Sequence, residues 1–324
     1  MTAENQEKES LLDREARFWD EQEEAIDDLY AKPHDWRFIP EIADYVIKPK
    51  VQALMRIIGE HREKIHTILD IGCGNGWFCH SCADNGIKAY GVDISSKKVE
   101  AAKVAAVERG IGELCHFKAS DIMELELPEK VDMITAHGSL HHLPDLEDKL
   151  PILIERFLKP DGLMLFVEPH HEGMSPGIQK LVFNCANSRL MGNWFDKEHY
   201  VRVRGEDGSG PAPAEEAVIA PADLTEAEQF NLRSESPAGL EFLGEEPDMG
   251  AIVQRDYDLI EEKYFHYMSG HLTNAFYTYM KPAWVRRLWR LFLPFTIWLD
   301  DRLCRKPGYN QYAEEGLWLL KRRK

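Results

Sequence analysis

Three closely spaced glycines, Gly72, Gly74 and Gly76, follow a short apolar run at residues 67–71. Glycines at these positions would let the backbone turn tightly and approach a ligand without intervening side chains. Such loops between a strand and a helix are typical of nucleotide-binding sites. The dinucleotide fingerprint Gly-x-Gly-x-x-Gly would need its third glycine at position 77, where this chain has Trp77. The spacing therefore argues against an NAD oxidoreductase.

Two acidic residues follow the next two apolar runs. Asp93 comes directly after Tyr90-Gly91-Val92, 17 residues beyond Gly76, and Asp121 follows the run at 114–118. A carboxylate at the end of the second strand is placed to accept hydrogen bonds from two ribose hydroxyls. We therefore predict that Asp93 faces the same ligand as the glycine loop.

Histidines and a glutamate follow two further apolar runs. His137 and His141 come after residues 131–136, and Glu168 comes after residues 163–167. Ligands of open α/β sheets bind outside the carboxyl ends of the strands, where any of these three groups could accept a proton. We predict them as candidate catalytic residues, although each histidine could equally be an ordinary packing or loop residue. The histidines close behind them are His142, His170 and His171.

The candidate residues must be positioned by secondary structure, and the sequence predicts alternating strands and helices around them. Short apolar runs predict strands, and capped segments such as Lys97 to Arg109, which begins after Ser95 and stops at Gly110, predict the helices between them. The predicted strands are residues 67–71, 88–92, 114–118, 131–136, 163–167, 264–268 and 316–320. This alternation predicts parallel βαβ units with helices on both faces of the sheet.

Further helices are predicted before, within and after this alternation. They are Leu12 to Tyr30, Ile42 to Ile58 with an interruption at Pro49, Leu150 to Leu158 before the turn Pro160-Asp161-Gly162, and Asp248 to Glu262. Residues 205–237 are rich in glycine, proline, alanine and acids, which indicates an insertion or a loop.

The Gly-x-Gly-x-Gly loop resembles motif I of the class I S-adenosylmethionine-dependent methyltransferases. The loop at 136–145, Ala119-Ser120-Asp121-Ile122, and the turn Leu158-Lys159-Pro160-Asp161-Gly162-Leu163 also look like that family, and the resemblance covers residues 65–170. It implies S-adenosylmethionine as the cofactor and Asp121 as the acid near the adenine. The residues that it implies for cofactor binding are Asp70, Gly72, Cys73, Gly74, Gly76, Asp93, Ile94, Asp121, Ile122 and His137. Asp70 could lie near the methionine portion or brace the glycine loop.

The resemblance implies a doubly wound, mostly parallel seven-stranded α/β sheet with N-terminal helices and helical insertions. We divide the chain into an N-terminal helical cap (1–64), a Rossmann-like cofactor-binding core (65–170), a variable insertion or lid (171–247) and a C-terminal part (248–324). The last part completes the sheet and carries an aromatic, basic helical insertion at 271–310.

The expected activity is methyl transfer, an in-line displacement in which the protein mostly positions the reacting atoms. Whether a general base is used depends on the acceptor. A non-catalytic scaffold or partner subunit that binds the cofactor remains the alternative. An aminopropyltransferase would share the sheet, but no acidic polyamine site is evident.

No metal is expected at this site. Glu168, His137 and His170 could offer ligands, but the carboxylates and asparagine that hold magnesium in catechol-type methyltransferases are missing at the matching points. Cys79 and Cys82 have the spacing of half a zinc site without a second pair, so we expect them to pack in the core.

The charge of the chain limits its partners. The net charge is −17, with 56 acidic against 39 basic residues. Nucleic-acid binding depends on lysine and arginine neutralising phosphates, so we expect no nucleic-acid substrate. The Asn-Pro-Pro-Tyr type motif of nucleobase-amino methyltransferases is also absent after the fourth strand. The acceptor is expected to be a small molecule, a sugar or a lipid, methylated at oxygen, and the oligomeric state is left open.

The ends of the chain bear on localisation. Residues 1–30 are acidic and polar without the apolar core of a signal peptide, and the six cysteines are scattered, which favours the cytoplasm. Residues 281–324 hold 11 basic and 4 acidic residues, mixed with large aromatics. The stretch 284–305 is therefore a candidate for peripheral contact at the inner membrane face, with a helix packed on the core as the alternative.

Overall fold

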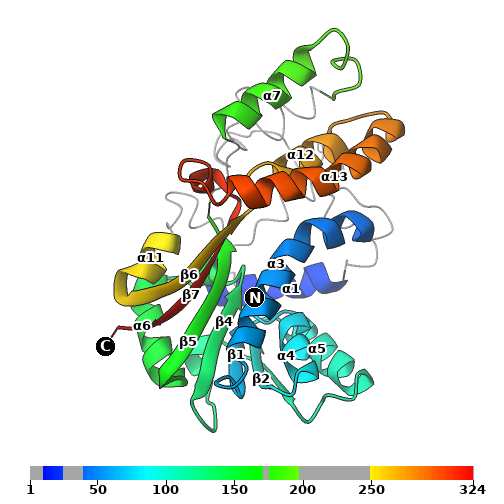
Figure 1. The fold of residues 1–324 in the computed structure, drawn as a ribbon. Coiled ribbons are helices and arrows are strands. Elements are labelled where there is room, and N and C mark those ends of the chain that lie inside the picture. The colour runs from blue at the N-terminus through cyan, green and yellow to red at the C-terminus, as the bar shows by residue number, and fades with distance from the viewer. Residues whose placement is uncertain (1–9, 25–38, 171–174, 197–248, 324) are drawn as a thin grey trace, which may run out of the picture.

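The computed structural model describes residues 10–24, 39–170, 175–196 and 249–323. Its centre is a seven-stranded sheet in the order β3-β2-β1-β4-β5-β7-β6 (Figure 1). Strands β1 to β5 are parallel, and β7 runs antiparallel between β5 and β6. This topology confirms the predicted α/β fold of the class I methyltransferase type.

The strands are β1 (Thr67–Ile71), β2 (Lys88–Asp93), β3 (Cys115–Ala119), β4 (Val131–His137), β5 (Leu158–Pro169), β6 (Tyr257–Phe265) and β7 (Glu315–Arg322). The helices are α1 (Leu11–Glu24), α3 (Pro40–Glu60), α4 (Trp77–Asp84), α5 (Ser96–Glu108), α6 (Leu146–Phe157), α7 (Pro176–Asn187), α11 (Met249–Asp256), α12 (Ser269–Thr278) and α13 (Ala283–Leu303). Short 3-10 turns are η2 (Ile122–Glu124), η3 (Leu140–His142) and η5 (Asn310–Tyr312).

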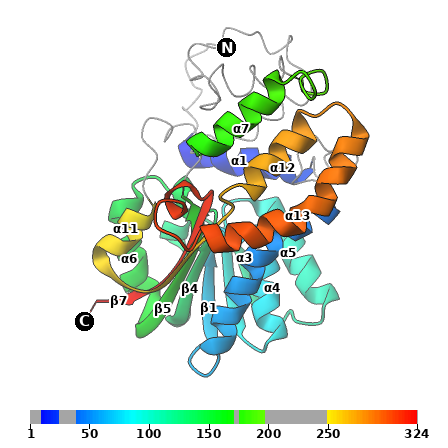
Figure 2. The ribbon, with the colours of Figure 1, turned by 45° about the horizontal axis from the view of Figure 1, so that its top comes forward.

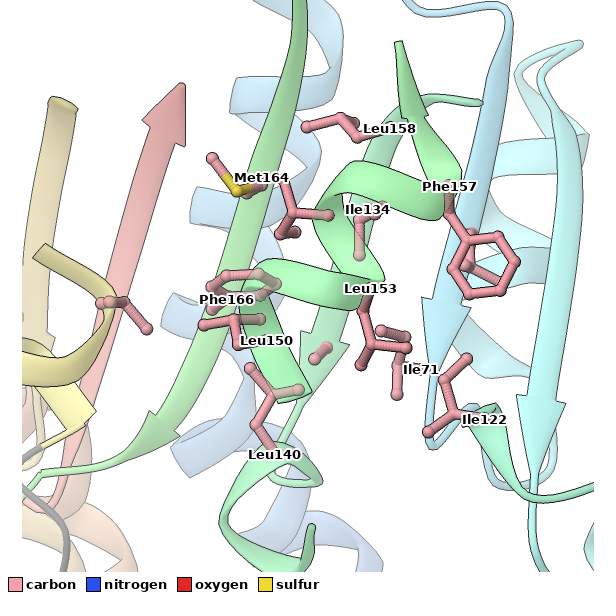
Figure 3. Close-up of a cluster of buried hydrophobic side chains, with 14 of the residues drawn as sticks. Ile71, Ile122, Ile134, Leu140, Leu150, Leu153, Phe157, Leu158, Met164 and Phe166 are labelled. Carbon is pink, nitrogen blue, oxygen red and sulfur yellow. The ribbon is translucent and has the colours of Figure 1, made fainter. Parts of the chain in front are cut away.

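Alternate residues of the central strands pack on opposite faces of the sheet. Leu69 and Ile134 belong to the core under α6 and α11, part of which Figure 3 shows, whereas Ile68 and Met133 belong to the core under α3 and α4. Each core consists of fully buried aliphatic and aromatic side chains, whose burial is the main stabilising contribution to the fold. Because helices cover both faces of the sheet, side chains on both faces of the central strands are buried. The central strands are therefore continuous apolar runs in the sequence.

A third core joins α7, α12 and α13 to the N-terminal half of α3. These helices lie beyond the carboxyl ends of the parallel strands (Figure 2). They are called the cap from here on, and this cap is distinct from the predicted N-terminal helical cap at 1–64. The helices α12 and α13 account for most of the segment 271–310, which the sequence predicted to be helical. The division of the chain into four parts stays a prediction.

The sixth strand is where the sequence prediction was wrong. The predicted helix at 248–262 ends at Asp256, and the strand is Tyr257–Phe265 instead of 264–268. β6 is the edge of the sheet and pairs with β7, with a register shift between Leu259 and Glu261. An edge strand tolerates charged side chains and a bulge breaks the alternation of apolar residues, so the segment resembled an acidic helix.

Two proline predictions also need correction. Helix α3 continues through Pro49, because its N-terminal half packs in the cap through Ile42 and its C-terminal half packs under the sheet through Leu54. Burial at both ends offsets the roughly 3 kcal/mol that an internal proline costs. The predicted turn at 160–162 lies inside β5, at the place where its pairing with β4 shifts register.

Some predictions fall outside the described residues. They concern the end of the first helix at 25–30, His171, and the glycine- and proline-rich stretch at 205–237. Among the described residues, no helix combines the length and the apolar character that crossing a bilayer would need.

Candidate active site

The glycine loop leaves β1 in close contact with the loop after β4. Gly72 has φ +67°, and a Cβ atom there would overlap Cβ of Ser139 and lie 2.8 Å from its Oγ. Ser139 Oγ donates a hydrogen bond of 2.6 Å to the carbonyl oxygen of Ile71, which holds the two loops together. Only glycine meets both the left-handed backbone and the close approach. Gly74, with φ +51°, faces open space, since a Cβ atom there would meet none of the described atoms within 4 Å.

Asp93 ties the loop to β2. Its Oδ2 accepts a hydrogen bond of 2.8 Å from the Gly74 N–H, and its Oδ1 accepts one of 2.9 Å from the Ser95 N–H. A carboxylate oxygen has two lone pairs, so each oxygen keeps the capacity to accept a hydrogen bond from a ligand. Asp93 therefore shapes the loop and can also bind to what the loop holds.

A cavity of about 280 Å³ opens between the glycine loop, the ends of β2 and β4, and helix α1. The predicted site residues that line it are Gly72, Cys73, Gly74, Asp93, Ile94, Asp121, Ile122 and His137. Those that do not line it are Asp70, Gly76, His141 and Glu168. The glycine loop and the acids after β2 and β3 thus meet at one site, as their spacing predicted.

Asp121 both lines the cavity and begins a turn. Its Oδ1 accepts a hydrogen bond of 2.9 Å from the Met123 N–H, which caps η2. The next residue, Ile122, is buried in the core and borders the cavity. The cap fixes Asp121 so that its second oxygen is left for a ligand.

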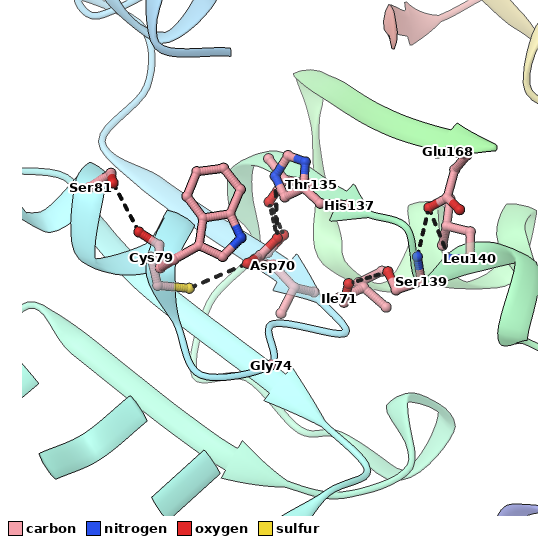
Figure 4. Close-up of polar contacts among 12 residues, drawn as sticks. Asp70, Ile71, Gly74, Cys79, Ser81, Thr135, His137, Ser139, Leu140 and Glu168 are labelled. Carbon is pink, nitrogen blue, oxygen red and sulfur yellow. Dashed lines mark hydrogen bonds and ion pairs between the residues drawn. The ribbon is translucent and has the colours of Figure 1, made fainter. Parts of the chain in front are cut away.

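Asp70 and His137 lie side by side under the loop (Figure 4). The Nε2 atom of His137 is 3.7 Å from Oδ1 of Asp70, which accepts a 2.7 Å hydrogen bond from Thr135 Oγ1. Among the described residues neither ring nitrogen of His137 has a hydrogen-bond partner, and the ring packs against Phe78 at 4.4 Å between centroids. Burial raises the pKa of Asp70 to about 7 and lowers the pKa of His137 to about 3. Asp70 itself lies on β1, behind the glycine loop, and is not among the residues that line the cavity.

We expect Asp70→Asn to make the unliganded protein more stable at pH 8 than the native chain by up to about 4 kcal/mol, since each pH unit between the ordinary carboxyl pKa of 3.8 and the raised pKa of about 7 corresponds to about 1.4 kcal/mol. The folded chain keeps the Asp70 proton up to about pH 7, whereas the unfolded chain loses it near pH 4. Native stability therefore falls as pH rises through this window and levels off above it. Urea unfolding at pH 5 and pH 8 measures the effect. Equal pH dependence in both proteins would contradict it.

Glu168, which is buried near the end of β5, contacts the partly exposed His141. Glu168 Oε1 accepts hydrogen bonds from the N–H groups of Ser139, at 3.1 Å, and Leu140, at 3.0 Å (Figure 4). Its Oε2 lies 2.7 Å from Nδ1 of His141. An ionised carboxylate only accepts hydrogen bonds, so Nδ1 carries the proton and Nε2 keeps its lone pair. The pair thus has the arrangement of a general base held by an acid.

The wall formed by α1 was not predicted. Leu12, Glu15 and Trp19 of this helix line the cavity, and Glu15 is only 3% exposed. Glu15 Oε1 accepts a 2.7 Å hydrogen bond from Trp19 Nε1 and lies 3.3 Å from Nδ1 of His142. The sequence predicted an apolar face on this helix but did not indicate which part of the protein that face would contact. His142, which the sequence analysis named near the site, also lines the cavity. The other lining residues that were not predicted as site residues are Ile71, Asn75, Trp77, Val92, Lys98, Ser120, Gly138, Ser139 and Leu143.

Asp20 fastens α1 to the start of α5. Its carboxylate accepts hydrogen bonds from Ser95 Oγ at 2.5 Å, Ser96 Oγ at 3.1 Å and the Lys97 N–H at 3.1 Å. Burial opposes ionisation, but these bonds outweigh it and lower the pKa of Asp20. The Lys98 ammonium lies 3.9 Å above the Trp19 ring and adds a second contact between the helices.

We expect Asp20→Ala to loosen α1 and to speed release of S-adenosylhomocysteine several-fold, because three hydrogen bonds that hold the helix over the cavity are lost. Stopped-flow displacement measures the release rate. Asp13→Ala, on the same helix but outside the cavity wall, is the control. Unchanged release from Asp20→Ala would show that α1 does not limit exchange.

Cys79, Cys82 and His170 lie outside the cavity lining and make contacts that support the fold. Cys79 and Cys82 are fully buried in the core under α4, consistent with packing. The His170 N–H donates to the carbonyl oxygen of Glu314, just before β7. Within the described parts of the chain, no three His, Cys, Asp or Glu side chains gather as metal ligands would.

Known proteins are similar to this chain over part of its length. Residues 62–208 match a family model described as a methyltransferase domain. The ubiquinone biosynthesis O-methyltransferase of Haemophilus ducreyi is 31% identical over 107 residues, which cover 30% of this chain and 42% of that protein. The 27-O-demethylrifamycin SV methyltransferase of Amycolatopsis mediterranei is 40% identical over 80 residues, which cover 24% and 29%.

Among solved structures, a S-adenosylmethionine-dependent methyltransferase from Clostridium acetobutylicum is 20% identical, with 40% of this chain and 50% of that chain covered and a TM-score of 0.32. The chain spans less than half the length of the curated relatives named above. The matched segment 62–208 contains the glycine loop, Asp93, Asp121 and the Glu168–His141 pair. Residues 62–208, less than half of this chain, therefore carry a methyltransferase domain on a sheet with the class I strand order, and such domains take S-adenosylmethionine as their cofactor.

Proposed function

We propose that the protein transfers the methyl group of S-adenosylmethionine to a hydroxyl oxygen of a small-molecule, sugar or lipid-type acceptor. The observation that carries the proposal is the Glu168–His141 pair, which presents an imidazole lone pair beside the loop that lines the cavity. Both relatives named above are methyltransferases whose names refer to small molecules, and the names indicate oxygen as the methylated atom, which supports transfer to oxygen.

The residues of the cavity fit this cofactor. Gly74 opens onto space where a ligand can approach the backbone, and the carboxylates of Asp93 and Asp121 each keep lone pairs for further hydrogen bonds. We assign Asp93 to the ribose hydroxyls and Asp121, with Ile122, to the adenine. His137 borders the cavity with two buried nitrogens that find no partner among the described residues, so a polar group of the cofactor could satisfy one of them.

In the proposed reaction a base of this chain would take the hydroxyl proton of the acceptor while the acceptor oxygen receives the methyl group. When bound, the cofactor supplies a methyl carbon already activated by its sulfonium. The protein then has to align the two reactants and remove the proton. We assign the proton to Nε2 of His141 and the orientation of the ring to Glu168. His137 is the weaker candidate for this step, because burial lowers its pKa to about 3.

Asp93→Ala is expected to weaken S-adenosylhomocysteine binding by about 2 kcal/mol, or roughly thirtyfold, since a charged acceptor of hydrogen bonds is lost. Asp93→Asn keeps one carbonyl oxygen for the Gly74 N–H and should lose less. Calorimetry measures both. Native affinity in Asp93→Ala would remove the residue from the cofactor site.

The activity itself is tested by release of S-adenosylhomocysteine in the presence of phenolic, sugar and lipid hydroxyl acceptors. Release that depends on one acceptor, together with mass addition of one methyl group at oxygen, supports the proposal. Thermal stabilisation by S-adenosylhomocysteine without turnover on any acceptor would instead favour the non-catalytic scaffold. Methylation at nitrogen or carbon would overturn the assignment to oxygen.

A further inference from the structure

Helix α13 is apolar on two opposite faces. One face is buried against the rest of the cap through Val285, Trp289, Leu293, Thr296 and Asp300. The opposite face carries six large apolar side chains that are 44% to 76% exposed. These residues, here called the exposed stripe, are Trp284, Leu288, Leu291, Phe292, Phe295 and Trp298. Their spacing places them on one side of the helix over four turns.

A stripe of this size is unusual for a surface that meets only water. Single exposed apolar residues are normal, but here the exposed side chains are adjacent and four of the six are aromatic. Phe295 and Trp298 stack on each other at 5.6 Å between ring centroids. The stripe therefore indicates a surface that contacts another molecule or a membrane when the protein functions.

Basic side chains border the stripe. Arg287 and Arg290 are exposed on one flank, and the Arg302 guanidinium lies 3.6 Å from the centroid of the Trp298 ring. Lys281 and Arg305 are exposed beyond the two ends of the helix. This border stands out on a chain whose net charge is −17. Large apolar rings framed by arginine are the composition of helices that lie in a membrane interface.

The helix is held rigidly in its place. Asp300 accepts hydrogen bonds from the N–H groups of Met268, at 3.0 Å, and Ser269, at 2.8 Å, and Trp289 Nε1 donates one of 3.1 Å to Thr273 Oγ1. These contacts fix the buried face on α12, so the stripe faces away from it. The two helices lie beyond the carboxyl ends of the parallel strands, over α3 (Figure 2).

We infer that the exposed stripe docks α13, parallel to the surface, on a membrane that contains anionic lipid. The aromatic and aliphatic side chains enter the interface and the bordering arginines contact the headgroup phosphates. The acidic remainder of the chain is repelled by the same lipids, which favours approach by this face. Docking therefore orients the cap and the carboxyl edge of the sheet toward the bilayer.

A second copy of the chain fits the stripe less well. In a two-fold dimer the same face meets itself, which brings the arginine borders of the two copies together. Anionic headgroups instead complement the arginines while the lipid interior receives the rings. Docking does not depend on methyl transfer, so its test stands apart from that of the enzymatic activity.

Co-sedimentation with vesicles tests the inference. The native protein should bind vesicles of phosphatidylcholine with phosphatidylglycerol, and bind weakly to phosphatidylcholine alone or at high salt. Leu291→Ser with Phe295→Ser should weaken binding at least about tenfold, because two large apolar side chains no longer enter the interface. Arg287→Glu with Arg290→Glu should lose binding to the anionic vesicles by about tenfold or more.

Val107→Ser is the matched control, since Val107 is 73% exposed on α5, away from the stripe, and should bind as the native chain does. Native protein that stays in the supernatant with anionic vesicles overturns the inference. Equal binding by the stripe variants also overturns it. A dimer that dissociates in Leu291→Ser with Phe295→Ser, without vesicle binding, would assign the stripe to contact between copies instead.

Discussion

Gly72→Ala and Gly74→Ala should both lose cofactor binding, but only Gly72→Ala should also lose several kcal/mol of folding stability. At Gly72 the left-handed backbone costs alanine about 1–2 kcal/mol. The collision with Ser139 adds the strain of overpacking, about 1–3 kcal/mol. At Gly74 the new methyl group meets none of the described protein atoms within 4 Å, so only the backbone cost remains. That methyl group occupies the space into which the cavity opens.

The experiment combines urea unfolding with calorimetry of S-adenosylhomocysteine binding. Gly110→Ala is the control, because Gly110 has φ +70°, no described atom within 4 Å of an added Cβ, and a position after α5, outside the cavity lining. It should show the backbone cost alone and bind the cofactor normally. Native affinity in Gly74→Ala would mean that the ligand does not approach the loop. Equal stability of Gly72→Ala and Gly74→Ala would mean that Ser139 moves aside without lowering the free energy of unfolding.

The core of the fold was predictable because its signals are local. A buried parallel strand is an apolar run of the same length as the strand, and a glycine or an acid ends it. β1 was predicted with its observed bounds, and the bounds of β2 and β3 differ by one residue. The glycine loop, Asp93 and Asp121 follow three neighbouring strands of one sheet, so their meeting followed from topology.

What could not be predicted depends on contacts between distant segments. Glu15 and Trp19 reach the cavity only because α1 packs across α5, and nothing in the first helix specifies that partner. β6 was predicted at 264–268 instead of Tyr257–Phe265, because an edge strand with a bulge lacks the alternation on which the prediction rests. Glu168 and His141 were each predicted, but their 2.7 Å contact joins residues 27 positions apart through the fold.

Glu168→Gln and His141→Ala should each lower kcat for methyl transfer by about 10²–10³ without changing cofactor affinity. A positioned base contributes roughly 10²–10⁴ to such a rate, and neither side chain lines the cavity. In Glu168→Gln an amide can still accept from the Ser139 and Leu140 N–H groups. Its NH2 group, which donates instead of accepting, then faces Nδ1 of His141, so the ring loses the partner that fixes its tautomer.

A double variant separates orientation of the ring from simple structural support. The double variant should be no slower than His141→Ala, since Glu168 acts through the ring. His142→Ala is the control: it removes a neighbouring ring that borders the cavity, so cofactor affinity should fall while kcat stays close to the native value. If Glu168→Gln lowers only the melting temperature and keeps the native kcat, Glu168 supports the loop alone and the base must be sought elsewhere.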